Sequence, residues 1–332
     1  MKALFFGVSG NSGLYCLNDL LSKGWTITGI SRTPPKISHP NFKFIAGDIT
    51  DKSLFNKLPS SVDVVINFAG VQPSILNFSE NTNLDETLRT YVDINIVGVF
   101  NILEFVRKKK IRNYIYTTSH REYENYWKDG FFIPNDLPPA INYKGDHVMY
   151  AISKTSAKMV GDYFSQAFDI RVFNMRLPMM FMVPSIPYYL KNGKQEIMPF
   201  LKIIKSALDG NPLEIWGNPN LQRDYVHIQN LSNMMSLCLE SKLNRGTFNV
   251  GTGEAVTTDR FIRSIGTMFF PDHSMNEYIY KPKNVTYKCA IYDINEQKEL
   301  LGYKPILLDE MLKRLKEEIK GKNKEYNWGW KV

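Results

Sequence analysis

The strongest constraint on the fold comes from three glycines, spaced three residues apart, near the start of the chain. Residues 2–6 are mostly apolar and predict a buried strand, Gly7, Gly10 and Gly13 follow, and residues 14–22 predict a helix. Glycines between a strand and a helix allow a tight turn and let backbone N–H groups approach a pyrophosphate. The pattern predicts a dinucleotide-binding turn, and a purely structural loop is the alternative interpretation. The expected cofactor contacts here are Gly7, Gly10, Asn11, Ser12 and Gly13.

Strands and helices are expected to alternate over the first half of the chain. Apolar runs at 26–30, 42–46, 62–68 and 113–118 predict strands, and residues 84–110 predict a long helical stretch. Such alternation predicts a parallel, doubly wound α/β sheet (a Rossmann fold), in which ligands lie at the carboxyl ends of the strands. The residues at such ends are Gly7, Ser31, Asp48, Ala69 and Ser119.

The residues after the second strand indicate which dinucleotide binds. An acid there would accept a hydrogen bond from the ribose 2′-hydroxyl of NAD, whereas arginine suits the 2′-phosphate of NADP. The sequence has Ser31 and Arg32, with Lys36 close behind and no acid. Serine and arginine bind phosphate through charge-assisted hydrogen bonds, so NADP(H) is the preferred prediction and NAD(H) the alternative. An exposed loop charge is the alternative interpretation of Arg32.

A tyrosine and a lysine suggest catalytic chemistry. Of the 18 tyrosines, Tyr150 is the one with a lysine four residues later, Lys154, in a stretch that predicts a helix. Residues four apart share a helix face, and an ammonium beside a phenol favours the phenolate, which makes tyrosine a usable acid or base. An ordinary amphipathic helix face gives the same spacing. Ser119 ends the fifth strand, where it could bind the same substrate oxygen or simply cap the strand.

Composition excludes several classes of protein. The formal net charge is +8, yet the densest basic run, residues 107–110, ends a predicted helix, where cations complement the helix dipole. No apolar run approaches the ~20 residues of a membrane helix, and the apolar N-terminus is too short for a signal peptide. Cys16, Cys238 and Cys289 have no disulfide or metal-site spacing. We therefore expect no nucleic-acid partner, no membrane, no metal and a cytoplasmic location.

Together these motifs resemble the extended short-chain dehydrogenases/reductases, and within them the nucleotide-sugar epimerases, dehydratases and reductases. The resemblance runs almost end to end. Besides the glycine turn and Tyr150-x3-Lys154, it includes Gly47-Asp48-Ile49, Asn95-x2-Gly98-x2-Asn101, Tyr116-x2-Ser119, Trp216-Gly217-x5-Arg223-Asp224 and Asn249-x-Gly251-x-Gly253.

The resemblance implies a role for each matching residue. Tyr150 would be the acid or base, and Lys154 would lower its pKa and hold the nicotinamide ribose. Ser119 would share the substrate oxygen, and Arg223 would bind a diphosphate, for which a guanidinium is well suited. A structural pair with Asp224 is the alternative for Arg223. The substrate contacts implied are Ser119, Arg121, Met198 and Arg223. The further cofactor contacts implied are Asp48, Ile49, Phe68, Ala69, Gly70, Asn95, Tyr150, Lys154 and Pro178.

The resemblance also implies a smaller C-terminal α/β lobe that binds the substrate. The expected division is 1–177 with 227–253 for the nucleotide-binding domain, 178–226 with 254–326 for the lobe, and 327–332 for a tail. Helices at about 84–110 and 151–168 resemble those that form a four-helix homodimer interface.

Departures from the family pattern narrow the predicted activity. His120 and Arg121 replace the acidic pair of the dehydratases, and Ser31-Arg32 replaces the acid of the 4-epimerases. Met179 stands where many members have an asparagine that contacts the sugar diphosphate. We expect an NADP-dependent oxidoreductase of a nucleotide-diphosphate sugar, foremost a 4-keto-deoxysugar nucleotide reductase. The alternatives are an epimerase with retained NAD(P), a reductase of a non-sugar carbonyl compound, and a non-catalytic NADP-binding regulator.

Arg121 carries a hypothesis of its own. It would help select the sugar or stabilise negative charge that develops on the substrate oxygen. The alternative is that His120 and Arg121 both point to the loop at 122–134.

Overall fold

The computed structural model describes residues 1–73, 84–145, 147–184, 187–191, 194–272, 277–285, 290–326, 329, 330 and 332. Cys289 and part of the predicted tail lie outside these residues.

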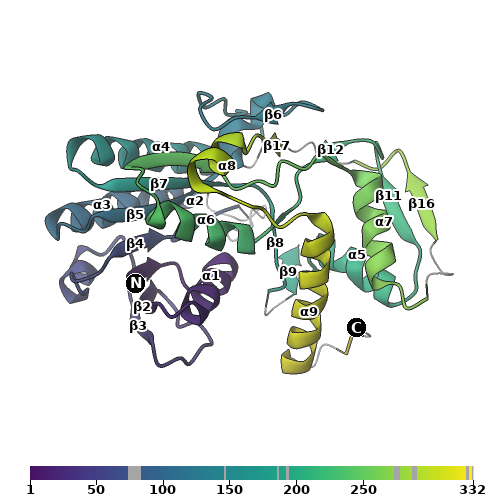
Figure 1. Cartoon of the computed structure of the whole chain (residues 1–332), viewed down its shortest axis with the longest axis horizontal. Helices are drawn as coiled ribbons and strands as arrows, with labels where there is room; N and C mark the ends of the chain where they lie inside the picture. The colour runs from purple at the N-terminus through teal and green to yellow at the C-terminus, as the bar shows by residue number, and fades with distance from the viewer. Residues whose placement is uncertain are drawn as a thin grey trace.

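A seven-stranded sheet forms the centre of the larger half of the molecule (Figure 1). Its strands, in spatial order, are β14 (Arg245–Asn249), β7 (Arg171–Leu177), β5 (Asn113–Ser119), β4 (Val64–Asn67), β1 (Lys2–Phe6), β2 (Thr26–Ser31) and β3 (Phe42–Ala46). All neighbouring pairs are parallel. The strand order reverses between β1 and β4, which creates a switch point where a ligand can bind. The predicted doubly wound α/β fold is confirmed.

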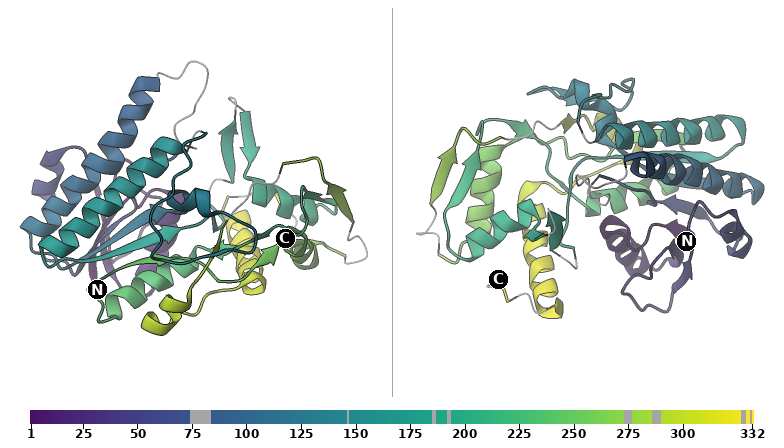
Figure 2. Two further views of the ribbon diagram at one scale, coloured as in Figure 1. Left: turned by 90° about the horizontal axis from the view of Figure 1, so that it is seen from above. Right: turned by 180° about the vertical axis from the view of Figure 1, so that it is seen from behind.

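Helices cover both faces of the sheet because each has an apolar stripe to bury. On one face, α1 (Asn11–Ser22) packs against α6 (Gln229–Glu240). On the other lie η1 (Lys52–Lys57), α2 (Leu84–Thr90), η2 (Tyr91–Gly98), α3 (Val99–Lys108) and α4 (Val148–Ala167). Figure 2 shows α3 and α4 side by side along the sheet. The stretch predicted as one helix at 84–110 is helical to Lys108, but η2 within it is a π-helix.

A second hydrophobic core lies at the other end of the molecule (Figure 1). It joins α5 (Pro199–Leu208), α7 (Thr258–Phe269) and α9 (Leu308–Tyr326) to the parallel pair β11 (Leu213–Trp216) and β16 (Tyr278–Lys281). Short pairs complete this end: β8 (Met180–Phe181) with β13 (Val226–His227), β9 (Tyr188–Lys191) with β10 (Lys194–Ile197), and β12 (Gln222–Arg223) with β15 (Val256–Thr257). The stacked rings of Tyr225 and Phe261, with centroids 3.8 Å apart, lie in this core.

One segment lies elsewhere than the sequence predicted. The expected lobe included all of 254–326, but β17 (Ile291–Tyr292) pairs with β6 (Phe132–Ile133). The side chains of Tyr292 and Tyr303, which flank α8 (Asn295–Leu301), are buried in the core of the large sheet. Pairing between two short strands so far apart in the sequence leaves no local sequence signal. Among the helices of the described ranges, none is long and apolar enough to cross a membrane.

Candidate functional site

The glycine turn lies at the carboxyl end of β1, against the end of β4. Gly7 has φ +87°, and a Cβ there would lie 2.6 Å from the backbone nitrogen of Ala69. A Cβ at Gly13 would lie 2.1 Å from the carbonyl oxygen of Gly7. Helix α1 begins at Asn11, earlier than predicted, so Asn11, Ser12 and Gly13 form its first turn. The turn therefore requires glycine for its own close packing, and it places a helix N-terminus at the sheet edge.

The end of β2 presents a serine and an arginine to solvent. The Ser31 hydroxyl donates to the carbonyl of Thr33 at 2.8 Å, and Arg32 is exposed. Within the described ranges, the Arg32 guanidinium forms no ion pair or hydrogen bond. Asp48, after β3, turns back into its own loop, where Oδ1 accepts from Thr50 N at 2.9 Å. Asp48, the carboxylate that follows the neighbouring strand β3, therefore forms no pair with Arg32.

The end of β4 is fixed by two asparagines. Asn67 Oδ1 accepts from Ala69 N at 3.0 Å. Asn95, predicted to contact the cofactor, accepts from Val71 N at 2.8 Å and donates to Ser153 Oγ at 2.9 Å. Its side chain thus ties the segment after Phe68 to α4, and it borders Gly70, where a Cβ would lie 3.0 Å from Asn95 Oδ1.

The structure brings the three predicted catalytic side chains together. Ser119, 4% exposed at the end of β5, hydrogen-bonds the phenol of Tyr150 in the first turn of α4. Burial raises the pKa of Tyr150, while the Ser119 hydrogen bond and the charge of Arg121 lower it. Since the net shift is upward, the phenol is protonated at neutral pH and is ready to donate a proton.

Lys154 lies one turn further along α4 and is only 5% exposed. Its ammonium is 4.2 Å from the centre of the Tyr116 ring. Burial lowers the pKa of Lys154 to about 7, and the negative charge of Glu122 opposes this change. No acceptor in the part of the chain that the structure describes takes a hydrogen bond from the ammonium. The charge of Arg121 also acts on Tyr150 and favours its ionised form.

His120 and Arg121 contact the loop that follows them. Arg121 pairs with Glu124 at 2.9 Å and stands 5.2 Å from the ring centre of Trp127, and His120 packs on the same ring at 4.9 Å. Burial, followed by the charges of Arg121 and His147, lowers the pKa of His120 to about 3. Both side chains therefore contact the loop, as the alternative interpretation held, yet Arg121 also acts on the catalytic phenol.

The remaining predicted substrate contacts lie on other elements. Arg223 is half-buried on β12, and the neighbouring Asp224 accepts from Thr252 N at 2.9 Å. Met198 is half-buried at the start of α5, beside the second core. Pro178 is buried after β7, and Met179 is 53% exposed. Of the described residues, none forms a group of three metal-ligand side chains.

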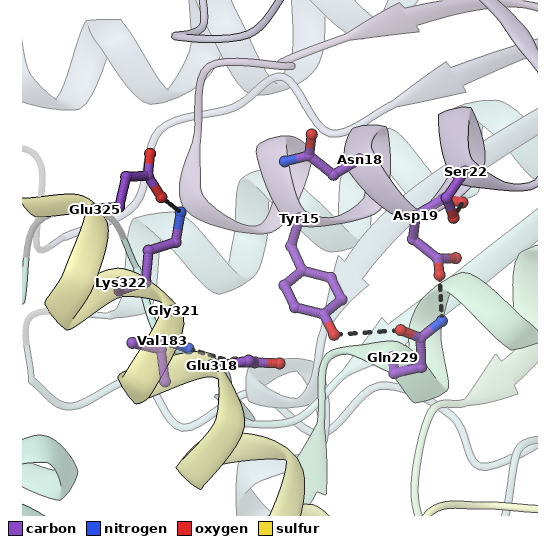
Figure 3. Close-up of a pocket in the computed structure, with 10 residues that line it drawn as sticks. All are labelled: Tyr15, Asn18, Asp19, Ser22, Val183, Gln229, Glu318, Gly321, Lys322 and Glu325. Atoms are coloured by element: carbon purple, nitrogen blue, oxygen red, sulfur yellow. Dashed lines mark hydrogen bonds and ion pairs between the residues drawn. The ribbon is translucent and has the colours of Figure 1, made fainter. Parts of the chain in front are cut away.

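A pocket of about 480 Å³ opens between α1, α6 and α9, away from the predicted site residues (Figure 3). The Tyr15 hydroxyl donates to Gln229 Oε1 at 3.2 Å, and Gln229 donates to Asp19 at 2.7 Å. Glu318 of α9 accepts from Val183 N and contacts His227, each at 3.0 Å. The carboxylates of Asp19 and Glu318 already have hydrogen-bond partners. We therefore interpret the pocket as part of the contact between the half with the large sheet and the half with the second core. His227 is fully buried and bonded to Glu318.

Sequence reasoning missed three residues that surround Lys154 and the end of β5. The Tyr116 ring contacts the Lys154 ammonium, and the negative charge of Glu122 opposes the lowering of the Lys154 pKa. Arg176 pairs with Glu122. The sequence could have drawn attention to Arg176, because a charged residue inside an apolar strand needs a partner. Nothing in the sequence identified Glu122 as that partner, since 53 residues separate the two.

A family profile and a curated protein match most of this chain. The profile of the NAD dependent epimerase/dehydratase family matches residues 3–251. A putative UDP-glucose 4-epimerase of Methanocaldococcus jannaschii is 27% identical over 295 residues, covering 86% of this chain and 87% of that protein.

Two solved structures show the same fold. UDP-glucose 4-epimerase of Thermotoga maritima, determined with UDP-glucose, superposes with a TM-score of 0.76 at 21% identity, covering 97% of this chain and 99% of that one. UDP-glucuronic acid 4-epimerase of Bacillus cereus, in complex with UDP-glucuronic acid and NAD, gives 0.71 at 21% identity with the same coverage. Because the family profile covers most of the chain, this protein belongs to the NAD dependent epimerase/dehydratase family and is an NAD(P)-dependent enzyme of the extended short-chain dehydrogenase/reductase group.

Proposed function

We propose that the protein is an NADP-dependent oxidoreductase of a nucleotide-diphosphate sugar, foremost a reductase of a 4-keto-deoxysugar nucleotide. The observation that carries the cofactor preference is the end of β2, where Arg32 is exposed and no acid stands nearby in the sequence. A carboxylate would repel a 2′-phosphate, whereas a free guanidinium binds it.

The residues at the sheet edge fit a nicotinamide dinucleotide. The glycine turn leaves the N-terminus of α1 open to a pyrophosphate, because Gly10 carries no side chain there, while Gly13 lets the helix pack closely against Gly7. Lys154 is a buried donor without an acceptor among the described side chains, as expected of a group whose partner is a ligand hydroxyl. Arg32 and Ser31 would hold the 2′-phosphate, and Lys154 the nicotinamide ribose.

The catalytic side chains support proton transfer to a carbonyl oxygen. A nicotinamide supplies hydride when it is bound. Tyr150 donates a proton to the substrate oxygen, and Ser119 hydrogen-bonds that oxygen and the phenol. Arg121 favours the phenolate that remains, because a positive charge lowers the pKa of a phenol. The raised pKa of Tyr150 keeps the phenol protonated at neutral pH, which is the form that donates a proton in a reduction.

The substrate class rests on the family and on Arg223. Solved structures of the same fold contain UDP-glucose and UDP-glucuronic acid. Arg223 matches the arginine that the family uses for a diphosphate, and its planar donors suit phosphate oxygens. Arg223→Ala should mainly weaken substrate binding. An unchanged KM would instead favour a non-sugar carbonyl compound.

The proposal is tested by titrating the purified protein with NADPH and NADH while following nicotinamide fluorescence. We expect tighter NADPH binding that Arg32→Ser weakens about tenfold, while NADH binding is retained. The matched control is Arg112→Ser, an exposed arginine at the opposite end of β5. Equal affinity for both cofactors would contradict the NADP preference. Oxidation of NADPH with 4-keto-sugar nucleotides then tests the reaction.

A second candidate is an epimerase that retains its cofactor, which the likeness to UDP-sugar 4-epimerases supports. It predicts that nucleotide is released when the purified protein is denatured, and that sugars interconvert with no added cofactor. Net consumption of NADPH in proportion to product would exclude it.

We also propose that the protein is a homodimer through α3 and α4. Large apolar side chains on or beside these helices are exposed: Val97, Phe100, Met159, Tyr163 and Phe168. Met159 and Tyr163, each 61% exposed, are four residues apart on one helix face. Sedimentation should give a dimer that Tyr163→Glu dissociates, and a monomeric wild type would refute the proposal.

A further inference from the structure

Arg176, inside β7, is the largest fully buried side chain that the structure describes. Its guanidinium donates to Asn249 Oδ1 and to the Tyr123 hydroxyl, each at 2.6 Å, and its Nε pairs with Glu122 Oε1. It also packs on the Tyr123 ring, 3.9 Å from the centroid. The polar groups of this cation are therefore occupied, which is the condition under which a buried charge is tolerated.

Glu122 is less completely bound. It lies three residues after Ser119, in η3 (His120–Tyr126), and is 1% exposed. One carboxylate oxygen pairs with Arg176, but Oε2 is buried without a donor from any described residue. A buried carboxylate oxygen without a donor is unfavourable and calls for an explanation. A second positive charge nearby would provide one.

Lys154 supplies such a charge through space, without an ion-pair contact to Glu122. Its ammonium rests on the Tyr116 ring, it is 5% exposed, and the charge of Glu122 acts on it. The ammonium contacts the ring of Tyr116 on β5, and two further ionisable groups are Tyr150, one turn earlier on its own helix, and Arg176 of β7, a strand that packs against this helix. Burial raises the pKa of both tyrosines, so both are uncharged, and Arg176 is paired with Glu122.

We propose that Glu122 is a positioning residue, whose second carboxylate oxygen is the counter-charge that keeps the buried Lys154 ammonium cationic beside the catalytic tyrosine. The assignment rests on the proposed function, since that assigns Lys154 to the cofactor. A cationic lysine offers its charge and three donors to ribose oxygens, while a neutral amine offers fewer donors and no charge. Glu122 thus acts on the cofactor through Lys154, without touching it.

The test is a double-mutant cycle on NADPH affinity, followed by fluorescence from about pH 6 to about pH 9. In the wild type, affinity should fall as pH rises through the pKa of Lys154, about 7 in the free protein. In Glu122→Gln the same fall should occur about one pH unit lower, which weakens binding up to tenfold near neutral pH. In a Lys154→Met background, Glu122→Gln should change nothing.

A second variant keeps the test valid if Glu122→Gln folds poorly. Glu122→Gln combined with Arg176→Met replaces the whole buried pair by neutral groups, a change that such sites often tolerate. A downward shift of the pH profile, smaller than in Glu122→Gln alone, should persist in this folded variant, because losing the Arg176 charge partly offsets losing the Glu122 charge. A wild-type profile there, or an equal effect of Glu122→Gln with and without Lys154, would overturn the inference.

The two proposals fail in different ways. If Lys154→Met binds NADPH as the wild type does at every pH, the assigned role of Lys154 is wrong and both proposals fall. If Lys154→Met weakens binding and abolishes its pH dependence, while Glu122→Gln leaves the midpoint unchanged, only the role of Glu122 falls.

Discussion

Two buried cations on neighbouring elements, Lys154 of α4 and Arg176 of β7, have opposite surroundings. Arg176 is 1% exposed and has a carboxylate, an amide and a phenol as partners. Lys154 is 5% exposed and rests on an aromatic ring, with no hydrogen-bond acceptor among the described residues. A buried charge whose partners come from the protein supports the fold, whereas one without partners marks the place of a ligand.

The largest effect on stability is expected at Arg176. Arg176→Met leaves Glu122 buried beside too little positive charge, and breaking a buried pair on one side costs about 3–5 kcal/mol. Urea unfolding should show this loss. The combination with Glu122→Gln should recover most of it, because no unpaired charge then remains. A loss below about 1 kcal/mol would show that the buried network is not structural.

Lys154→Met should behave in the opposite way. Methionine fills similar space without a charge to desolvate, so the free energy of unfolding at neutral pH should stay the same or rise. Turnover should fall at least about 100-fold, equivalent to roughly 3 kcal/mol, because the cofactor loses the ammonium that holds its ribose. Both are measured on one preparation, by urea unfolding and by NADPH oxidation. If Lys154→Met destabilised the protein as much as Arg176→Met does, the two cations would both be structural and the difference between them would be refuted.

The same contrast explains how far the sequence could predict the molecule. Local patterns such as residues 2–6 before Gly7 are enough to indicate a parallel sheet, because apolar strand runs and glycine turns are short-range signals. They also led to Ser119 and Tyr150, whose side chains hydrogen-bond in the structure, and to Lys154, one turn further along the same helix. The pairing of β17 with β6, more than 150 residues apart, has no such signal.

The electrostatics of the site depend on contacts that no spacing encodes. Glu122 and Arg176 meet through the register of β5 and β7, where Thr118 lies opposite Arg176. Arg121, predicted as a substrate contact, is also the charge that acts on Tyr150, because η3 folds back against the start of α4. Such roles follow from tertiary packing, so only the chemistry of the side chains, and not their partners, was predictable.

His120 adds a third basic group, which burial keeps neutral. Its pKa is lowered from the ordinary value of 6.5 to about 3. Below about pH 6.5 the unfolded chain takes up a proton that the native state refuses until about pH 3, so stability falls as the pH falls through this window. Between pH 7 and pH 5 the loss from this group is roughly 2 kcal/mol. Urea unfolding at both pH values should show a loss smaller by that amount in His120→Asn, and an unchanged loss would contradict the burial of a neutral imidazole.

Lys158 provides the smallest effect and sharpens the contrast, because it lies one turn after Lys154 on the same helix. It pairs with Asp162 at 2.9 Å, and this carboxylate, 38% exposed, also accepts from Asn174. A partly exposed pair of this kind contributes about 0.3–0.5 kcal/mol, so Lys158→Met should change the free energy of unfolding by no more than that. NADPH affinity and its pH dependence should match the wild type. Equal losses of NADPH affinity in Lys154→Met and Lys158→Met would mean that any positive charge on α4 serves. A loss confined to Lys154→Met would show that the position beside Tyr116 decides.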